Sequence, residues 1–216
     1  MCRFQYSGEH ERIQEFEFVE EEKIMIKNIA IVSLSSGTIG EDFVKHEVDI
    51  GIKRLNDFGL NVRFMPHALE GIEYVKNHPE KRAADLLQAL SDPEIDMILC
   101  AIGGDDTYRL LPFLFEHNEL ADAVSDKVFL GFSDTTINHF MLHKVGMKTF
   151  YGQSFLADVC ELDKDMLPYT KKYFEELNKY RNDKRSQTQR NLVRRKDGFW
   201  YQSGWHTFKI SFRLWF

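Results

Sequence analysis

The sequence has no apolar run near the roughly 20 residues that a transmembrane helix needs. Residues 1–23, MCRFQYSGEHERIQEFEFVEEEK, are acidic and do not have the apolar centre of a secretory signal peptide. The chain also has no internal repeat and no long Gly/Ser linker. From these absences we expect a cytoplasmic protein that does not use a membrane as a partner.

Cysteine is scarce. Cys2, Cys100 and Cys160 are far apart and have neither a CxxC spacing nor a His-containing metal spacing. Cys100 lies inside the apolar run MILCAI, so we expect it to be a small buried hydrophobic residue. The sequence therefore predicts no metal site.

Positive charge is in deficit overall, with a net charge of -6, and this gives no electrostatic reason to expect nucleic acid as a partner. The average hides a split. Residues 1–180 hold 19 Lys+Arg against 32 Asp+Glu, whereas residues 181–216 hold 9 against 2 and all three tryptophans. The chain therefore divides into an acidic extension (1–24), a central domain (25–180) and an anomalous basic and aromatic tail (181–216).

The central domain alternates short apolar runs with helical patterns, which is typical of an α/β fold with a mostly parallel sheet and helices on both faces. The expected strands are 26–33, 61–65, 95–102, 127–132 and 148–152. The expected helices are 42–57, 78–90, 107–114, 135–145 and one that begins at or after Pro168. We expect Pro112 to kink or shorten the third of them. We assign Phe43 and His46 to the apolar side of the first helix.

The segment GFSDTT, residues 131–136, joins an apolar strand to a helix. Gly131 gives room for a sharp bend, and Ser133 would project its hydroxyl from it as in a nucleophile elbow. The N–H group of Asp134, at the start of the helix, would face the same place and stabilise an oxyanion. Alternatively, Ser133, Asp134 and Thr135 simply cap the helix.

Two other loops follow predicted strands. IGGDDT places Gly103 and Gly104 after a buried strand, where their amides and that of Asp105 could complete an oxyanion hole, bind a phosphate, or only form a tight turn. In SLSSG, Ser35, Ser36 and Gly37 could contact a carboxylate or phosphate of a ligand, or only lead into a helix. All three loops should meet, because ligands bind at the carboxyl ends of parallel strands.

In the order IVSLSSG, AIGGDDTYRLLPFL, GFSDTT and TFYGQS, these segments resemble the LD-carboxypeptidase family of serine peptidases, which includes the microcin C self-immunity proteins. GFSDTT and TFYG are more similar to the microcin immunity branch. Where the family usually has Pro, this chain has Leu34 and Gln153, so we expect altered substrate loops.

The resemblance implies a Ser-Glu-His triad with Ser133 as nucleophile. It implies an oxyanion hole from the amides near Gly104, Asp105 and Asp134, and no metal or organic cofactor. It further implies a small peptide or peptidyl-nucleotide substrate, a homodimer in the intact family, and a Glu and a His from a C-terminal domain beyond the end of this chain.

We therefore expect the C-terminal domain to be missing or incomplete and the chain to have little activity. His139 and His143 lie on the helix after Ser133 and move away from it, so we expect them to pack in the core or on the surface. His206, Glu161 and Glu175 have no feature that marks them as substitutes.

Three alternatives stay open. The tail is either a frame-altered segment or a hairpin formed by residues 199–216 around Ser203 and Gly204. The GGDDT loop also fits a phosphofructokinase-like phosphotransferase, although the sequence has no GxxxxGK[ST] loop. The chain could also be a non-catalytic fragment that binds a ligand or partner through the same loops.

Overall fold

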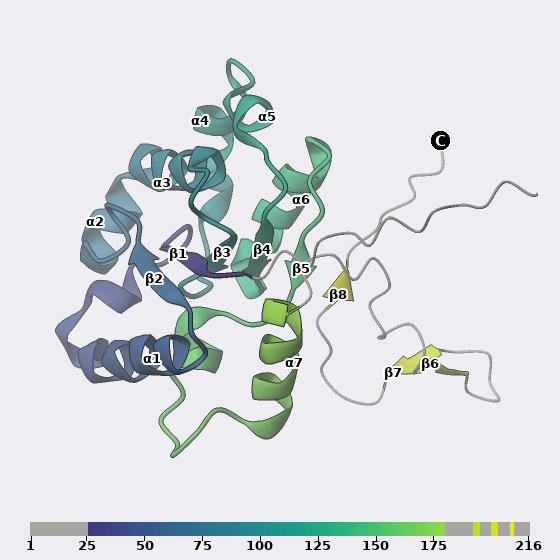
Figure 1. The fold of residues 1–216 in the computed structure, drawn as a ribbon. Helices are drawn as coiled ribbons and strands as arrows, with labels where there is room; N and C mark the ends of the chain where they lie inside the picture. Colours follow the sequence, from purple (N-terminus) through teal and green to yellow (C-terminus); the bar gives the residue numbers. More distant parts are fainter. Residues whose placement is uncertain (1–25, 180–191, 195–199, 203–207, 210–216) are drawn as a thin grey trace, which may run out of the picture.

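The computed structural model describes residues 26–179 together with 192–194, 200–202 and 208–209 (Figure 1). The predicted acidic extension and most of the predicted tail, including His206, lie outside these residues. The strands are β1 Asn28–Val32, β2 Asn61–Phe64, β3 Met97–Cys100, β4 Val128–Gly131, β5 Phe150–Tyr151, β6 Leu192–Arg194, β7 Trp200–Gln202 and β8 Phe208–Lys209.

The main sheet has the order β2-β1-β3-β4-β5-β8. Strands β1 to β5 pair in parallel, with registers that include Ile29↔Met97 and Leu99↔Leu130. The mostly parallel α/β sheet expected from the sequence is therefore confirmed.

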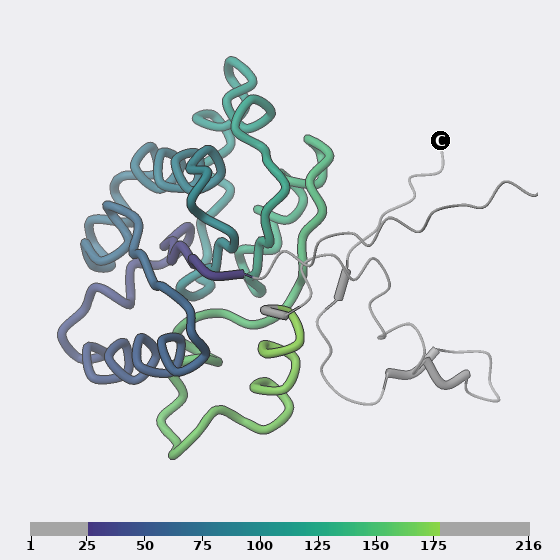
Figure 2. The backbone as a smooth tube through the Cα atoms, viewed as in Figure 1, coloured from purple at the N-terminus to yellow at the C-terminus, as the bar shows by residue number. Residues whose placement is uncertain are grey.

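Helices cover both faces of this sheet, because strands buried on both sides need two apolar layers. On one face, Ile29, Ile31 and Leu99 pack with α1 (Lys45–Asp57), the π-helix η5 (Phe155–Val159) and α7 (Pro168–Lys179). On the other, Ala30 and Ile98 pack with α3 (Pro79–Ser91), α4 (Leu111–Phe115), α5 (Glu119–Ala123) and α6 (Thr136–Lys144). In Figure 2 the green trace after β5 lies on the same side of the strands as α1.

Several local predictions need correction. The structure also contains α2 (Gly71–Asn77), α5 and the π-helix, which are not among the elements expected from the sequence. The first helix begins as a short 3-10 turn, Asp42–Val44, before α1, and Phe43 is 65% exposed, so its assignment to the apolar side was wrong. His46 is also exposed. Both residues lie around the join between the 3-10 turn and α1, where one continuous helical period does not apply.

The other predicted features near the sheet are found. Cys100 is fully buried, and burial raises the pKa of its thiol to about 12, as expected for a hydrophobic role. Pro112 occupies the first turn of α4 after the 3-10 turn Thr107–Leu110, so the helix is interrupted where predicted. Within the described residues, no helix combines the length and apolarity needed to cross a membrane.

Most of residues 199–216, for which the sequence leaves open a hairpin around Ser203 and Gly204, lie outside the described residues. β7 pairs antiparallel with β6, and β8 pairs antiparallel with β5. The two strands on either side of Ser203 and Gly204 thus have different partners.

His139 is a buried residue of α6 that is hydrogen-bonded to the end of β4. Its Nε2 lies 2.9 Å from the carbonyl oxygen of Gly131 and its Nδ1 2.8 Å from the Thr149 hydroxyl. Because a carbonyl can only accept, Nε2 carries the proton and Nδ1 accepts from Thr149. Burial lowers the pKa of His139 to about 4, although the bond to Gly131 opposes this. The packing role expected for this histidine is confirmed. The folded protein contains His139 in its neutral form.

We predict that replacing Phe174 with Ala lowers the free energy of unfolding by about 3 to 5 kcal/mol, because a buried phenylalanine leaves a cavity. The Phe174 ring is fully buried and packs 5.7 Å, centroid to centroid, from that of Phe58. Phe43→Ala is the matched control and should change stability by no more than about 0.5 kcal/mol. Urea denaturation measures both, and equal effects would contradict the described packing of α7.

We also predict that acid weakens the fold through His139. The unfolded imidazole has a pKa of about 6.5 and binds the proton more tightly than the folded one, so stability is full above that pH and falls towards the folded pKa of about 4. The loss should be on the order of 3 kcal/mol. His139→Gln should remove this part of the pH dependence, whereas His143→Gln should retain it. Urea midpoints measured from pH 7.5 to 4 provide the test.

Candidate active site

Three loops meet at the carboxyl end of the sheet because β1, β3 and β4 are parallel neighbours. A Cβ atom on Gly103 would lie 2.8 Å from Cβ and 3.0 Å from Oγ of Ser133. A Cβ atom on Gly104 would lie 3.2 Å from the main-chain nitrogen of Ser36. The double-glycine loop thus touches the Ser133 bend on one side and the SLSSG loop on the other, as the sequence analysis anticipated.

Ser133 occupies a sharp and strained bend. Its φ of 63° is left-handed, a conformation that costs a residue with a side chain roughly 1 to 2 kcal/mol. A Cβ atom on Gly131 would lie 2.7 Å from Thr135 Oγ1 and 2.8 Å from Cys100 Sγ, so only glycine fits before the bend. Ser133 itself is exposed. The geometry is that of a strand-turn-helix elbow with the serine at its tip.

Four main-chain N–H groups around Ser133 are free. Those of Gly103, Gly104, Asp105 and Asp134 have no hydrogen-bond acceptor within the described part of the chain. Gly104 and Asp105 are exposed, and Asp134 is half-buried. Unpaired amides beside an exposed hydroxyl are suited to bind negative charge.

The Asp134 side chain joins all three loops. Its Oδ2 accepts a hydrogen bond from the Ser35 hydroxyl and another, at 2.9 Å, from the N–H group of Thr107. Ser35 is buried, and its hydroxyl donates to Asp134. The carboxylate therefore holds Ser35 and Thr107 while its own main-chain N–H remains unpaired.

The other two residues of the SLSSG loop have different surroundings. The Ser36 hydroxyl lies 2.7 Å from that of Thr38 and is partly exposed. Gly37 packs against α2, where an added Cβ atom would lie 2.2 Å from the carbonyl oxygen of Gly71. Ser36 is thus open to a ligand, and Gly37 allows the loop to approach α2.

Tyr151, at the end of β5, was missed by the sequence analysis. The N–H group of Ser133 donates to its hydroxyl at 3.4 Å, and the Thr136 hydroxyl lies 3.5 Å from it. The parallel register Gly131↔Tyr151 places this tyrosine beside the Ser133 bend. Its position at the end of a predicted strand that follows the strand before Ser133 is the feature of the sequence from which this contact could have been predicted.

Within the described residues, no imidazole or carboxylate group is hydrogen-bonded to Ser133 Oγ. His139 is engaged by Gly131 and Thr149, and Glu161 accepts from the N–H group of Leu167. His143 lies one turn further along α6. The described residues also contain no group of three or more side chains suited to hold a metal ion. A base for Ser133 is thus not part of the described site.

Comparisons with known proteins identify the family and the fold. The chain matches the LD-carboxypeptidase N-terminal domain over residues 29–152. An MccF-like protein from Streptococcus pneumoniae, solved in complex with AMP, is 68% identical, with a TM-score of 0.71 over 71% of this chain and 45% of that one.

Two curated relatives are more distant. The Bacillus subtilis "Probable murein peptide carboxypeptidase" is 29% identical over 137 residues, which cover 61% of this chain and 40% of that protein. The Escherichia coli microcin C7 self-immunity protein MccF is 35% identical over 83 residues, or 38% of this chain and 23% of that protein. The chain spans less than half the length of each of these relatives. With its family match from β1 to β5 and over all three loops, the chain belongs to the LD-carboxypeptidase family.

Proposed function

We propose that this chain carries the nucleophile half of a serine peptidase of the LD-carboxypeptidase and microcin immunity type. The observation that supports this most is the exposed, strained Ser133 beside four unpaired main-chain N–H groups. In this proposal Ser133 is catalytic, and Gly104, Asp105 and Asp134 form the oxyanion hole. The substrate-binding residues are Ser35, Ser36, Gly37 and Gly103. The reaction needs no metal or organic cofactor.

The proposed chemistry is acyl transfer. Ser133 Oγ attacks the carbonyl carbon of an amide, a C–O bond forms, and the carbonyl oxygen becomes an oxyanion held by the free amides. The C–N bond then breaks, and a base passes the serine proton to the leaving amine. Water hydrolyses the acyl-enzyme in a second step. The His that the resemblance implies would be this base, and the Glu would orient it.

The proposed substrate is a small peptide or a peptidyl-nucleotide. The nucleotide class is supported by the Streptococcus pneumoniae protein, which was solved in complex with AMP and is 68% identical over the matched region. The proposal includes a cytoplasmic location and a homodimer of the intact protein.

The phosphotransferase alternative rests on the two carboxylates of the GGDDT loop. The Asp106 carboxylate is paired with Arg82 at 2.6 Å and with Arg109 at 3.1 Å, whereas Asp105 is exposed. We carry this alternative as an outcome of the test below.

We predict that a fluorophosphonate probe labels the chain at Ser133, slowly, and that added imidazole accelerates the labelling several-fold. A serine without a base keeps a weakly nucleophilic hydroxyl, and a positioned general base contributes typically 10² to 10⁴ in rate. Mass spectrometry of the labelled peptide identifies the site, and Ser133→Ala should abolish the signal. Gly103→Ala should slow labelling, because its methyl group would collide with the serine side chain.

Absence of labelling at Ser133 with imidazole present would reject the acyl-transfer proposal and leave a non-catalytic binding fragment. Thermal stabilisation by ATP together with phosphate transfer that survives Ser133→Ala would instead favour the phosphotransferase. Competition with the probe separates the substrate classes. Slower labelling in the presence of AMP supports a peptidyl-nucleotide substrate. Slower labelling with a short peptide, but not with AMP, supports a peptide substrate.

A further inference from the structure

Arg82 is a buried arginine on α3 that lies under two of the site loops. Its side chain is 1% exposed, and it does not contact Ser133. The Nη1 atom donates to the carbonyl oxygens of Leu34 and Ser35, each at 3.2 Å. One nitrogen of the guanidinium group thus holds the main chain that follows β1.

The same guanidinium group holds the loop that follows β3. Nη1 lies 2.6 Å from Asp106 Oδ1, and Nη2 lies 3.4 Å from Oδ2. Burial alone would raise the pKa of Asp106, but hydrogen bonds and charge from Arg82, with a further contribution from Arg109, hold it below its usual range. The carboxylate therefore stays ionised and paired, and the two loops are joined through a single side chain.

The position of these loops determines where the free amides lie. Gly104 packs on Ser35 and Ser36, and Ser35 donates to the side chain of Asp134, next to the nucleophile. A shift of the Leu34–Ser35 main chain would move Gly104 and Asp134 relative to each other. Displacements of about 1 Å in such a site can cost a factor of about 10² in rate.

We infer that Arg82 is a positioning residue for the Ser133 site, which sets the spacing of the oxyanion-hole amides by tying the loop after β1 to the loop after β3. This inference rests on the proposed function. An arginine is required because its planar fork offers several donors in fixed directions, whereas a lysine offers one compact ammonium group.

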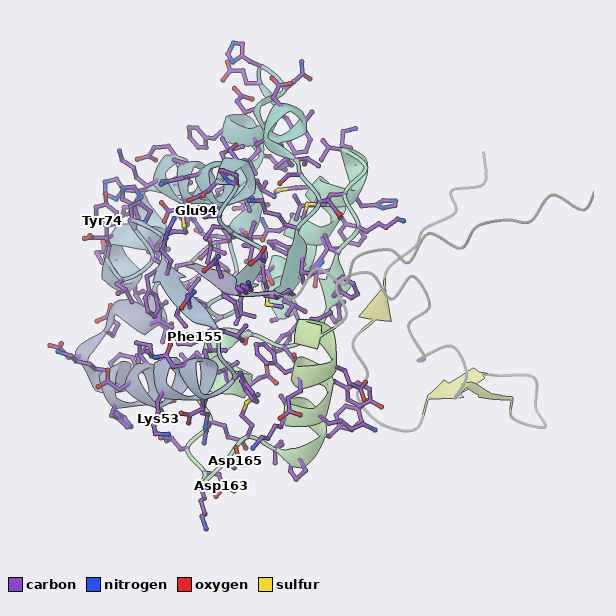
Figure 3. All side chains as sticks on the ribbon, viewed as in Figure 1. Lys53, Tyr74, Glu94, Phe155, Asp163 and Asp165 are labelled. Carbon is purple, nitrogen blue, oxygen red and sulfur yellow. The ribbon has the colours of Figure 1, made fainter. Side chains whose placement is uncertain are left out.

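The chain contains a matched control in Arg54. This residue is also buried and also holds main-chain carbonyls, those of Val159 and Glu161 at 2.8 Å and that of Asp163 at 2.7 Å. It lies near the end of α1, and the loop that it holds reaches the bottom of the view at Asp163 (Figure 3). Loss of Arg54 therefore tests general destabilisation without touching the three site loops.

The experiment compares the full chain with the Arg82→Lys and Arg54→Lys variants. We expect Arg82→Lys to lower the maximal rate of Ser133 labelling by fluorophosphonate, in the presence of imidazole, by about 10- to 100-fold, with little change in the half-saturating probe concentration. Hydrogen exchange of the Thr107 amide, which the loop after β3 holds against Asp134 Oδ2 at 2.9 Å, should rise about tenfold. Arg54→Lys should leave the labelling rate and the exchange of this amide within about twofold of the wild type.

Two outcomes would overturn the inference: wild-type labelling and exchange in Arg82→Lys, or an equal loss of labelling in Arg54→Lys. If the wild-type chain does not label at all, the proposed function fails, and exchange of the Thr107 amide alone then decides whether Arg82 controls the two loops. If Arg82→Lys does not fold, Asp106→Asn removes the same pairing from the other side. It should give the same localised rise in exchange, and an unchanged exchange would again reject the role.

Discussion

The contact between Gly103 and Ser133 is the constraint on which the site depends. There is no room for a methyl group at residue 103, because it would lie 2.8 Å from the serine Cβ atom. The contact is possible because β3 and β4 are adjacent parallel strands, so their following loops leave the sheet on the same edge. The close approach puts the free amides of the double-glycine loop beside the exposed hydroxyl of a residue with strained backbone.

Polar groups behind this contact connect the loops to one another. The Asp134 carboxylate accepts from the SLSSG loop and from Thr107, and the Arg82 guanidinium reaches the same two loops from α3. Buried polar groups of this kind are costly unless they are paired, so the contacts favour one relative position of the loops. The apolar layers stabilise the sheet itself, whereas the contacts of Asp134 and Arg82 determine how the loops at its carboxyl edge are arranged.

The sequence alone predicted the parallel sheet and the three loops, because apolar runs such as MILCAI and glycines after a strand act locally. It did not predict Arg82, Asp106 or Tyr151 as neighbours of the site. Their partners are 47, 24 and 18 residues away along the chain, and no short pattern records such distances. Phe43 was misplaced for a related reason, since helical periodicity was extended across a 3-10 turn.

β5 has only two residues, and its register with β4 sets a limit on the whole edge. Side chains alternate between the faces of a strand, so a slip of one position would turn the Tyr151 ring to the opposite face and replace it with Phe150 or Gly152. The Ser133 amide would then lose the phenol oxygen to which it donates. The alignment of two short strands thereby decides which side chain stands next to the serine. An insertion or deletion between Val145 and Phe150 would change that side chain together with the position of the buried Met147 and the contact between Thr149 and His139.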